Sequence, residues 1–198
     1  ATEEVQAVRS GAIQGDGRLS SFEWVESLII AIIVVGIVFT FVFRIVTVSG
    51  SSMYPNLQHG DRLIVTSWFY TPQAGDIVVL KRTDGLNEPI VKRVIATEGQ
   101  NIYIDYDAGD VYVDGQILDE TAYLGDTKTY RPMASEEEIY EFPEEGLEVP
   151  EGCIFVLGDN RSVSKDSRYL DVYMVDERHI LGKAQFILFP FSRLGVVA

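Results

Sequence analysis

An apolar run from Phe22 to Phe43 constrains this chain more than any other feature of its sequence. Beyond the first two turns of that run the only polar residue is Thr40, whose hydroxyl can hydrogen-bond back along a helix. A helix of about 20 apolar residues crosses the hydrocarbon of a bilayer. We therefore expect an uncleaved transmembrane anchor helix over residues 22–46, after a polar tail that covers residues 1–21.

The residues that flank the run also suit a membrane. Trp24 stands where an aromatic belt meets the interface, and Arg44 can extend toward water at the other end. Arg9 and Arg18 in the tail favour a cytoplasmic N-terminus and an extracytoplasmic remainder. Two alternatives remain: a buried core helix, which other elements would have to cover on every face, and a cleavable secretory signal, whose apolar core is usually shorter.

The charge and the cysteine count exclude several classes of protein. A net charge of −14 disfavours nucleic acid as a partner, because phosphates need a basic face. The single cysteine, Cys153, excludes an internal disulfide and a thiolate ligand set for zinc. The chain has only two histidines, His59 and His179, far apart in the sequence. We expect neither a metal site nor a cofactor.

The rest of the chain, residues 47–198, has the pattern of a mostly β domain. Short segments rich in Val, Ile, Tyr and Phe alternate with Gly-Asp, Asp-Gly and proline turns. The segment VYVDGQIL predicts a two-residue hairpin, and a short helical piece is expected near residues 176–179. The acidic stretch 134–151 contains two prolines and is expected to be an exposed loop or insertion with a solvated surface.

Three segments carry side chains suited to catalysis, and each also has a purely structural interpretation. Ser52 stands in SGSSMYP, where a serine commonly serves its own turn. Lys92 lies in the apolar run IVKRVIA; on an inward face its amine loses hydration and becomes a general base, whereas on an outward face it is an ordinary surface lysine. Residues 158–168, GDNRSVSKDSR, suit a rigid site-forming loop or a plain polar loop.

The three segments, in this order behind an apolar span, closely resemble the type I signal peptidases, which are membrane-anchored serine proteases with a serine–lysine dyad. GDRLIV, GDIVVLKR and ILGKAQFILFP match as well, so the resemblance covers nearly everything from Val46 to the end. It implies a signal-peptidase-like β catalytic domain with Ser52 as nucleophile, Lys92 as general base and Ser164 as the hydroxyl that orients the lysine. It also implies two supporting ion pairs, Asp159 with Arg93 and Asp166 with Arg168.

The resemblance further implies that the substrates are preproteins, cut after small residues at the outer surface of the cell membrane, with the lipid bilayer and the secretion translocon as partners. The Ser52 N–H is expected in the oxyanion hole, and Gly50 lacks the second hydroxyl that some relatives carry there. Shallow apolar pockets would select small side chains. The residues expected to line them are Val46, Val48, Met53 and Val91.

Departures from the family pattern leave the dyad intact. Asn56 replaces the usual threonine after the proline, Ile90 replaces a common aromatic residue, and ATEGQ replaces a glycine-rich turn. His59, in LQHGD, is expected to be only a turn residue, so lysine must take the role that histidine usually has beside a catalytic serine.

Two rival interpretations remain open. Self-cleaving repressors of the DNA-damage response share a related Ser–Lys β core, but they lack a membrane span and carry a DNA-binding domain. The other interpretation is an anchored β domain that binds peptides or partners without catalysis. The distance between the Ser52 hydroxyl and the Lys92 amine discriminates, since hydrogen-bond reach supports an enzyme.

Overall fold

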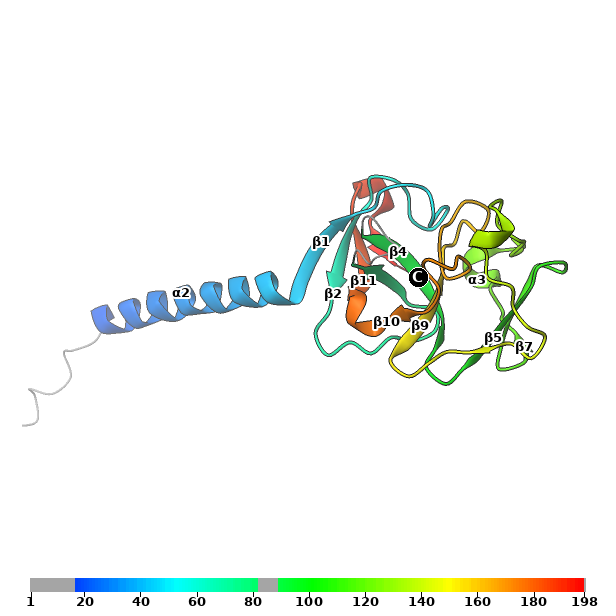
Figure 1. The fold of residues 1–198 in the computed structure, drawn as a ribbon. Coiled ribbons are helices and arrows are strands. Elements are labelled where there is room, and N and C mark those ends of the chain that lie inside the picture. The colour runs from blue at the N-terminus through cyan, green and yellow to red at the C-terminus, as the bar shows by residue number, and fades with distance from the viewer. Residues whose placement is uncertain (1–16, 82–88, 198) are drawn as a thin grey trace, which may run out of the picture. The chain divides into compact units, whose positions relative to one another are not determined.

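The computed structural model describes residues 17–81 and 89–197 of the chain. They form a helix, α2 (Gly17–Val42), and a domain of antiparallel strands that begins directly after it in the sequence (Figure 1). The helix and the domain are two separate units and are described in turn.

The helix differs from the expected anchor at both ends. Residues 1–16 of the expected tail lie outside the described residues, and residues 17–21 are helical. The helix ends at Val42, and residues 43–46, expected within it, instead open the first strand because they pair with residues 63–66 of a second strand. No helix in the described part of the chain has the length and mean hydropathy of a membrane span.

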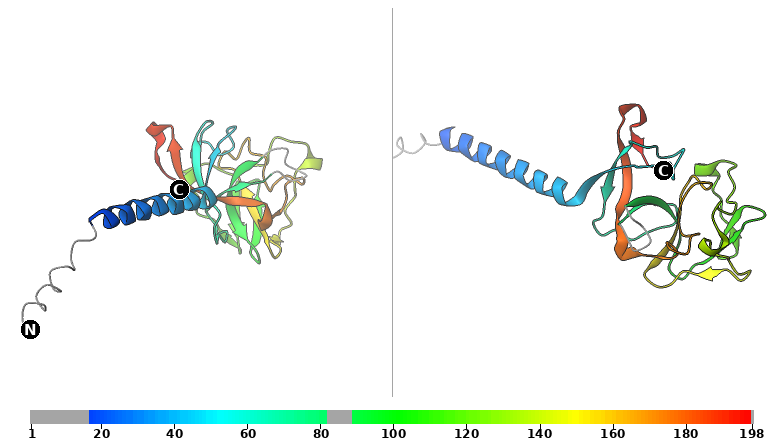
Figure 2. Two further views of the ribbon diagram at one scale, coloured as in Figure 1. Left: turned by 90° about the vertical axis from the view of Figure 1, so that its left-hand side faces the viewer. Right: turned by 45° about the horizontal axis from the view of Figure 1, so that its top comes forward.

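A large antiparallel sheet forms most of the β domain. Figure 2 shows its long strand β11 in orange, beside β2. In spatial order the strands are β1 (Phe43–Thr47), β2 (Arg62–Thr66), β11 (Ile180–Phe189), β3 (Ile77–Leu80), β4 (Ile90–Thr97), β9 (Cys153–Leu157) and β10 (Val175–Asp176), and β12 (Gly195–Val196) pairs with β11.

A second, small antiparallel sheet contains the expected hairpin. Asp114 and Gly115 connect its two strands with φ angles of 52° and 75°, which are typical of a two-residue turn with both φ angles positive. The order of this sheet is β7 (Gln116–Ile117), β6 (Asp110–Val113), β5 (Asn101–Asp105) and β8 (Leu147–Glu148). The short helices are α3 (Thr121–Leu124), η1 (Glu136–Glu138), η2 (Glu177–His179) and η3 (Phe191–Arg193). The expected helical piece near residues 176–179 is thus confirmed.

The large sheet is buried on both faces at its centre. All four residues of β3 are buried, as are the six inner residues of β4, whereas β2 alternates between buried Leu63 and Val65 and more exposed neighbours. A charged residue in the middle of β4 is therefore removed from water on whichever face it lies. Lys92 and Arg93 occupy those positions, opposite Val78 and Ile77 of β3.

The acidic segment 134–151 exposes its described glutamates, as its composition predicts, but it is also attached to the core. Ile139 and Val149 are 2% and 1% exposed, and the segment contributes strand β8 to the small sheet. The ring of Phe142 packs edge-on against Phe155 of β9, with 5.8 Å between the ring centroids. Apolar and aromatic residues spaced among the glutamates thus fasten the segment to the core, while the carboxylates account for its charge.

Candidate active site

The side chains of Ser52 and Lys92 meet within hydrogen-bond distance although they are 40 residues apart. Ser52 lies in the turn that follows β1, and Lys92 lies in β4. Lys92 Nζ is 2.9 Å from Ser52 Oγ and donates a second hydrogen bond, of 3.2 Å, to the carbonyl oxygen of Val91. This geometry suits proton transfer between a hydroxyl and an amine.

The surroundings of Lys92 favour its neutral form. The residue is 2% exposed, and burial lowers the pKa of its amine from 10.5 to about 8, although the negative charge of Asp166 opposes that shift. A neutral amine has a lone pair that can accept the hydrogen of the Ser52 hydroxyl. Lys92 therefore faces inward, as a general base would, and is not an ordinary surface lysine.

The expected hydrogen bond between Ser164 and Lys92 is not formed. Ser164 is 1% exposed, and its hydroxyl lies beside the carboxylate of Asp166, whose pKa it helps to lower, and not in a hydrogen bond with Lys92. The residue nevertheless lies close to the nucleophile, because a Cβ atom placed on Gly158 would collide with both the Ser164 hydroxyl and the carbonyl oxygen of Ser52. Glycine is required at position 158 so that these two segments can approach each other.

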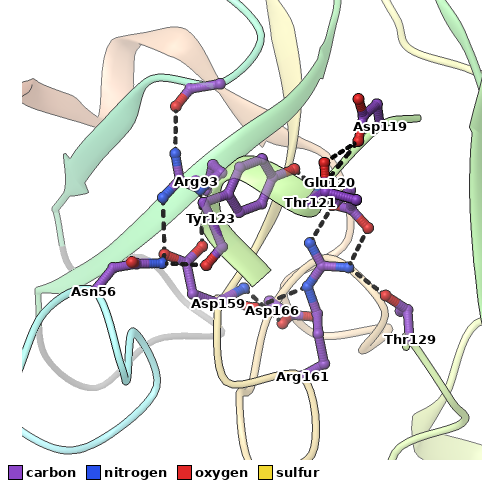
Figure 3. A network of polar contacts seen from close by, with 12 residues as sticks. Asn56, Arg93, Asp119, Glu120, Thr121, Tyr123, Thr129, Asp159, Arg161 and Asp166 are labelled. Carbon is purple, nitrogen blue, oxygen red and sulfur yellow. Dashed lines mark hydrogen bonds and ion pairs between the residues drawn. The ribbon is translucent and has the colours of Figure 1, made fainter. Parts of the chain in front are cut away.

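The expected ion pair between Arg93 and Asp159 is present and links the two halves of the site (Figure 3). Arg93 donates two hydrogen bonds of 2.8 Å to the carboxylate and a third to the carbonyl oxygen of Gly75. Asn56, four residues beyond Ser52, donates a 2.7 Å hydrogen bond to the same carboxylate and another to the carbonyl oxygen of Tyr123. Asp159 therefore joins the nucleophile loop to the strand that carries Lys92.

The second expected ion pair, Asp166 with Arg168, is present and fully buried. Burial opposes ionisation of the carboxyl, but the guanidinium of Arg168 and the N–H of Gly158 hold the pKa of Asp166 below its usual value. Arg168 also donates to the carbonyl oxygen of Arg161. The pair thus fixes the loop 158–168 from within.

A further set of contacts was not expected from the sequence. Arg161 donates to the carboxylate of Glu120, to the hydroxyl of Thr129 and to the carbonyl oxygen of Gly158 (Figure 3). Tyr123 donates a 2.7 Å hydrogen bond to Glu120. Its ring lies beneath the guanidinium of Arg93, 4.0 Å from ring centroid to Cζ. Arg161 belongs to the motif GDNRSVSKDSR, but no local signal marks Glu120 or Tyr123, which act through long-range contacts.

A hollow of about 240 Å³ opens beside Ser52. Three of the four residues expected to line a substrate pocket, Val46, Val48 and Val91, do line it, together with Ile90. Met53 does not: it is 1% exposed and packs in the core with Leu57, Leu63 and their neighbours. The side chain that follows the nucleophile in sequence thus belongs to the core and not to the lining of this hollow.

The backbone near Ser52 offers a donor for a developing oxyanion. The Ser52 N–H donates no hydrogen bond to a described residue. Gly50, with a φ of 87°, donates its N–H to Nδ1 of His59 at 3.2 Å, so His59 supports the nucleophile loop in addition to its place in a turn. Residues 17–81 and 89–197 contain no cluster of potential ligands that could hold a metal ion.

Comparisons with known proteins identify the family of this chain. Residues 21–189 match the family described as signal peptidase, peptidase S26. The chain is 33% identical over 178 residues to signal peptidase I of Bacillus licheniformis, covering 88% of this chain and 92% of that one. It is 35% identical over 183 residues to probable signal peptidase I-1 of Synechocystis sp., covering 87% and 85%. The crystal structure of a signal peptidase I from Enterococcus faecalis aligns with a TM-score of 0.42 at 28% identity, over 59% of this chain and 98% of that one. The chain belongs to the signal peptidase family, peptidase S26.

Proposed function

We propose that this chain removes signal peptides from preproteins, with Ser52 as the nucleophile and Lys92 as the general base. The observation that carries the proposal is the distance of 2.9 Å between Ser52 Oγ and the amine of a lysine that is 2% exposed. A serine hydroxyl needs a base within reach, and a lysine serves only when its pKa falls toward the working pH.

The proposed reaction begins when the neutral amine takes the hydroxyl proton as Ser52 Oγ attacks the carbonyl carbon of the scissile bond. The Ser52 N–H stabilises the oxygen that becomes negative; one such donor contributes about 3–4 kcal/mol. The ammonium group then gives its proton to the leaving amine, and an acyl-enzyme remains. Water, deprotonated by the same amine, attacks this ester and releases the signal peptide.

The hollow beside Ser52 supports a preference for small side chains before the cut bond. Val46, Val48, Ile90 and Val91 form the apolar part of its lining, beside the polar residues Thr47, Ser49 and Ser52, and its volume of about 240 Å³ is modest. We propose that this hollow receives the small residues at the first and third positions before the cut. Asp159, Asp166 and their arginines hold the site rigid, and Ser164 packs beside Gly158, close to the carbonyl oxygen of Ser52.

We propose that α2 anchors the catalytic domain in the cell membrane, with the N-terminus cytoplasmic. The large apolar side chains of the helix from Phe22 to Ile37 are 45–74% exposed, a surface that favours lipid over water. The domain would then meet preproteins at the outer surface, as they leave the translocon. A protease added outside cells is expected to digest a tag at the C-terminus; protection of that tag in cells with an intact membrane would contradict the orientation.

The pH dependence of cleavage tests the proposed base. Below a pKa of about 8 the amine is charged and cannot accept a proton, so kcat/KM should fall about tenfold per pH unit and be about a hundredfold lower at pH 6 than on the plateau. The measurement follows cleavage of one preprotein by the chain in detergent, with circular dichroism at each pH as a control for folding. A flat profile down to pH 6 argues against a lysine base, and no cleavage at any pH argues against the function.

A further inference from the structure

A second hollow, of about 600 Å³, shares no lining residue with the one that the proposed function uses. The residues of the loop divide between the two hollows. Residues 46–49, before Ser52, line the first, whereas Tyr54 and Pro55, after it, line the second. We call the second hollow the Tyr54 groove. Its remaining lining comes from residues 124–133 and 159–162.

Asn160 connects the Tyr54 groove to the reacting serine. Its backbone N–H donates a 2.9 Å hydrogen bond to the carbonyl oxygen of Ser52, and its side-chain amide donates to that of Ser51 at 3.1 Å. Asn160 also lines the groove. A peptide that lies across Ser52 with one end in the first hollow therefore has the Tyr54 groove within reach of its other end.

The walls of the Tyr54 groove suit an extended peptide. Tyr54 and Tyr130 are 54% and 57% exposed, and Met133 is 99% exposed, so that the groove presents aromatic and flexible apolar surface to solvent. Surfaces of this kind adapt to varied side chains.

The accessible charges on the lining of the Tyr54 groove are positive, although the chain has a net charge of −14. Lys128 and Arg131 have side chains that are 46% and 36% exposed. Their acidic partners, Asp110 and Glu141, lie outside the lining. The other charged lining residues, Asp159 and Arg161, are buried and paired. A carboxylate in the groove thus meets two cations from the lining, each of which it shares with the carboxylate that already pairs with it, Asp110 for Lys128 and Glu141 for Arg131.

We infer that the Tyr54 groove binds the substrate segment that follows the cut bond and favours an acidic side chain within it. The inference rests on the proposed function, since it takes the first hollow as the site for the residues before the cut. It adds a determinant of specificity for the part of the substrate that follows the cut bond and leaves as the amine. Lys128 and Arg131 would select by charge, while Tyr54 and Met133 supply apolar contact.

The test compares three preproteins that differ only at the second to fourth residues after the cut, which are glutamate, glutamine or lysine. At low ionic strength the wild-type chain is expected to cut the acidic substrate about threefold to tenfold faster, as kcat/KM, than the neutral one, and the basic substrate slowest. The difference should lie mainly in KM and shrink in salt. Lys128→Glu together with Arg131→Glu should reverse the order, and Lys128→Gln should weaken it.

Arg178→Glu is the control for the effect of charge reversal as such, because it reverses one positive charge at an exposed arginine of η2 that is paired with Asp176 and lies outside the groove lining. It should keep the preference of the wild type. A wild type that cuts all three substrates equally, or a groove variant that keeps the order, would overturn the inference while the proposed function stands. If no substrate is cut, the proposed function fails. The inference is then decided by the order in which the three preproteins, labelled with a fluorophore, bind to the Ser52→Ala variant.

Discussion

Substitution of Lys92 by methionine is expected to lower the rate of preprotein cleavage by at least about a thousandfold. Methionine is close to lysine in length and suits a buried position, but it has no amine to take the proton of the Ser52 hydroxyl 2.9 Å away. Ser52→Ala should cause a loss of the same order. Because the two groups act as one unit, the double variant should be no slower than either single variant.

Lys183→Met is the matched control for the loss of a lysine. Lys183 lies in β11 of the same sheet, opposite Val78, but its side chain is 31% exposed and pairs with Asp76. This variant should cleave at nearly the wild-type rate. A Lys92→Met variant that folds normally, by near-ultraviolet circular dichroism, and retains more than about a tenth of the activity would show that another group is the base.

The elements that the sequence predicts well depend on local patterns. The alternation of Leu63 and Val65 with polar neighbours is visible in the letters of β2, and the Asp114–Gly115 turn needs only residues that tolerate positive φ. The sequence alone does not decide whether Lys92 faces inward, because a strand places alternate residues on opposite faces and its sequence does not show which face is buried. In this fold both faces of β4 are covered, and this decides the question.

The features that the sequence did not predict depend on contacts between distant segments. Residues 43–46 read equally well as the end of an apolar helix or as a strand, and pairing with β2 decides for the strand. Asn56 and Asp159 are 103 residues apart, and Glu120 and Arg161 are 41 apart, so no local signal connects them. The direction of Met53, which packs in the core, and the rotamer of Ser164 depend on packing that only the assembled domain defines.

Asp159→Ala is expected to lower the free energy of unfolding by about 3–5 kcal/mol. Arg93 is 2% exposed, and the substitution takes the carboxylate away from its buried charge, while its contacts with the carbonyl oxygen of Gly75 and the ring of Tyr123 remain. Asn56 loses a hydrogen-bond acceptor as well. Urea unfolding followed by circular dichroism measures the change, and the slope of the transition should stay constant if unfolding remains two-state.

Two comparisons distinguish the effect of the buried charge on the free energy of unfolding from the effect of a general loss of contacts. Asp176→Ala removes the partner of an arginine, Arg178, whose side chain is 89% exposed, and should change stability far less, since water replaces the lost partner. Removing both charges with Arg93→Met and Asp159→Leu should cost less than Asp159→Ala alone, because no unpaired charge remains in the core. Equal losses for Asp159→Ala and Asp176→Ala would mean that Arg93 regains water on losing its partner. The rigid connection between the nucleophile loop and β4 would then have to come from the contacts of α3.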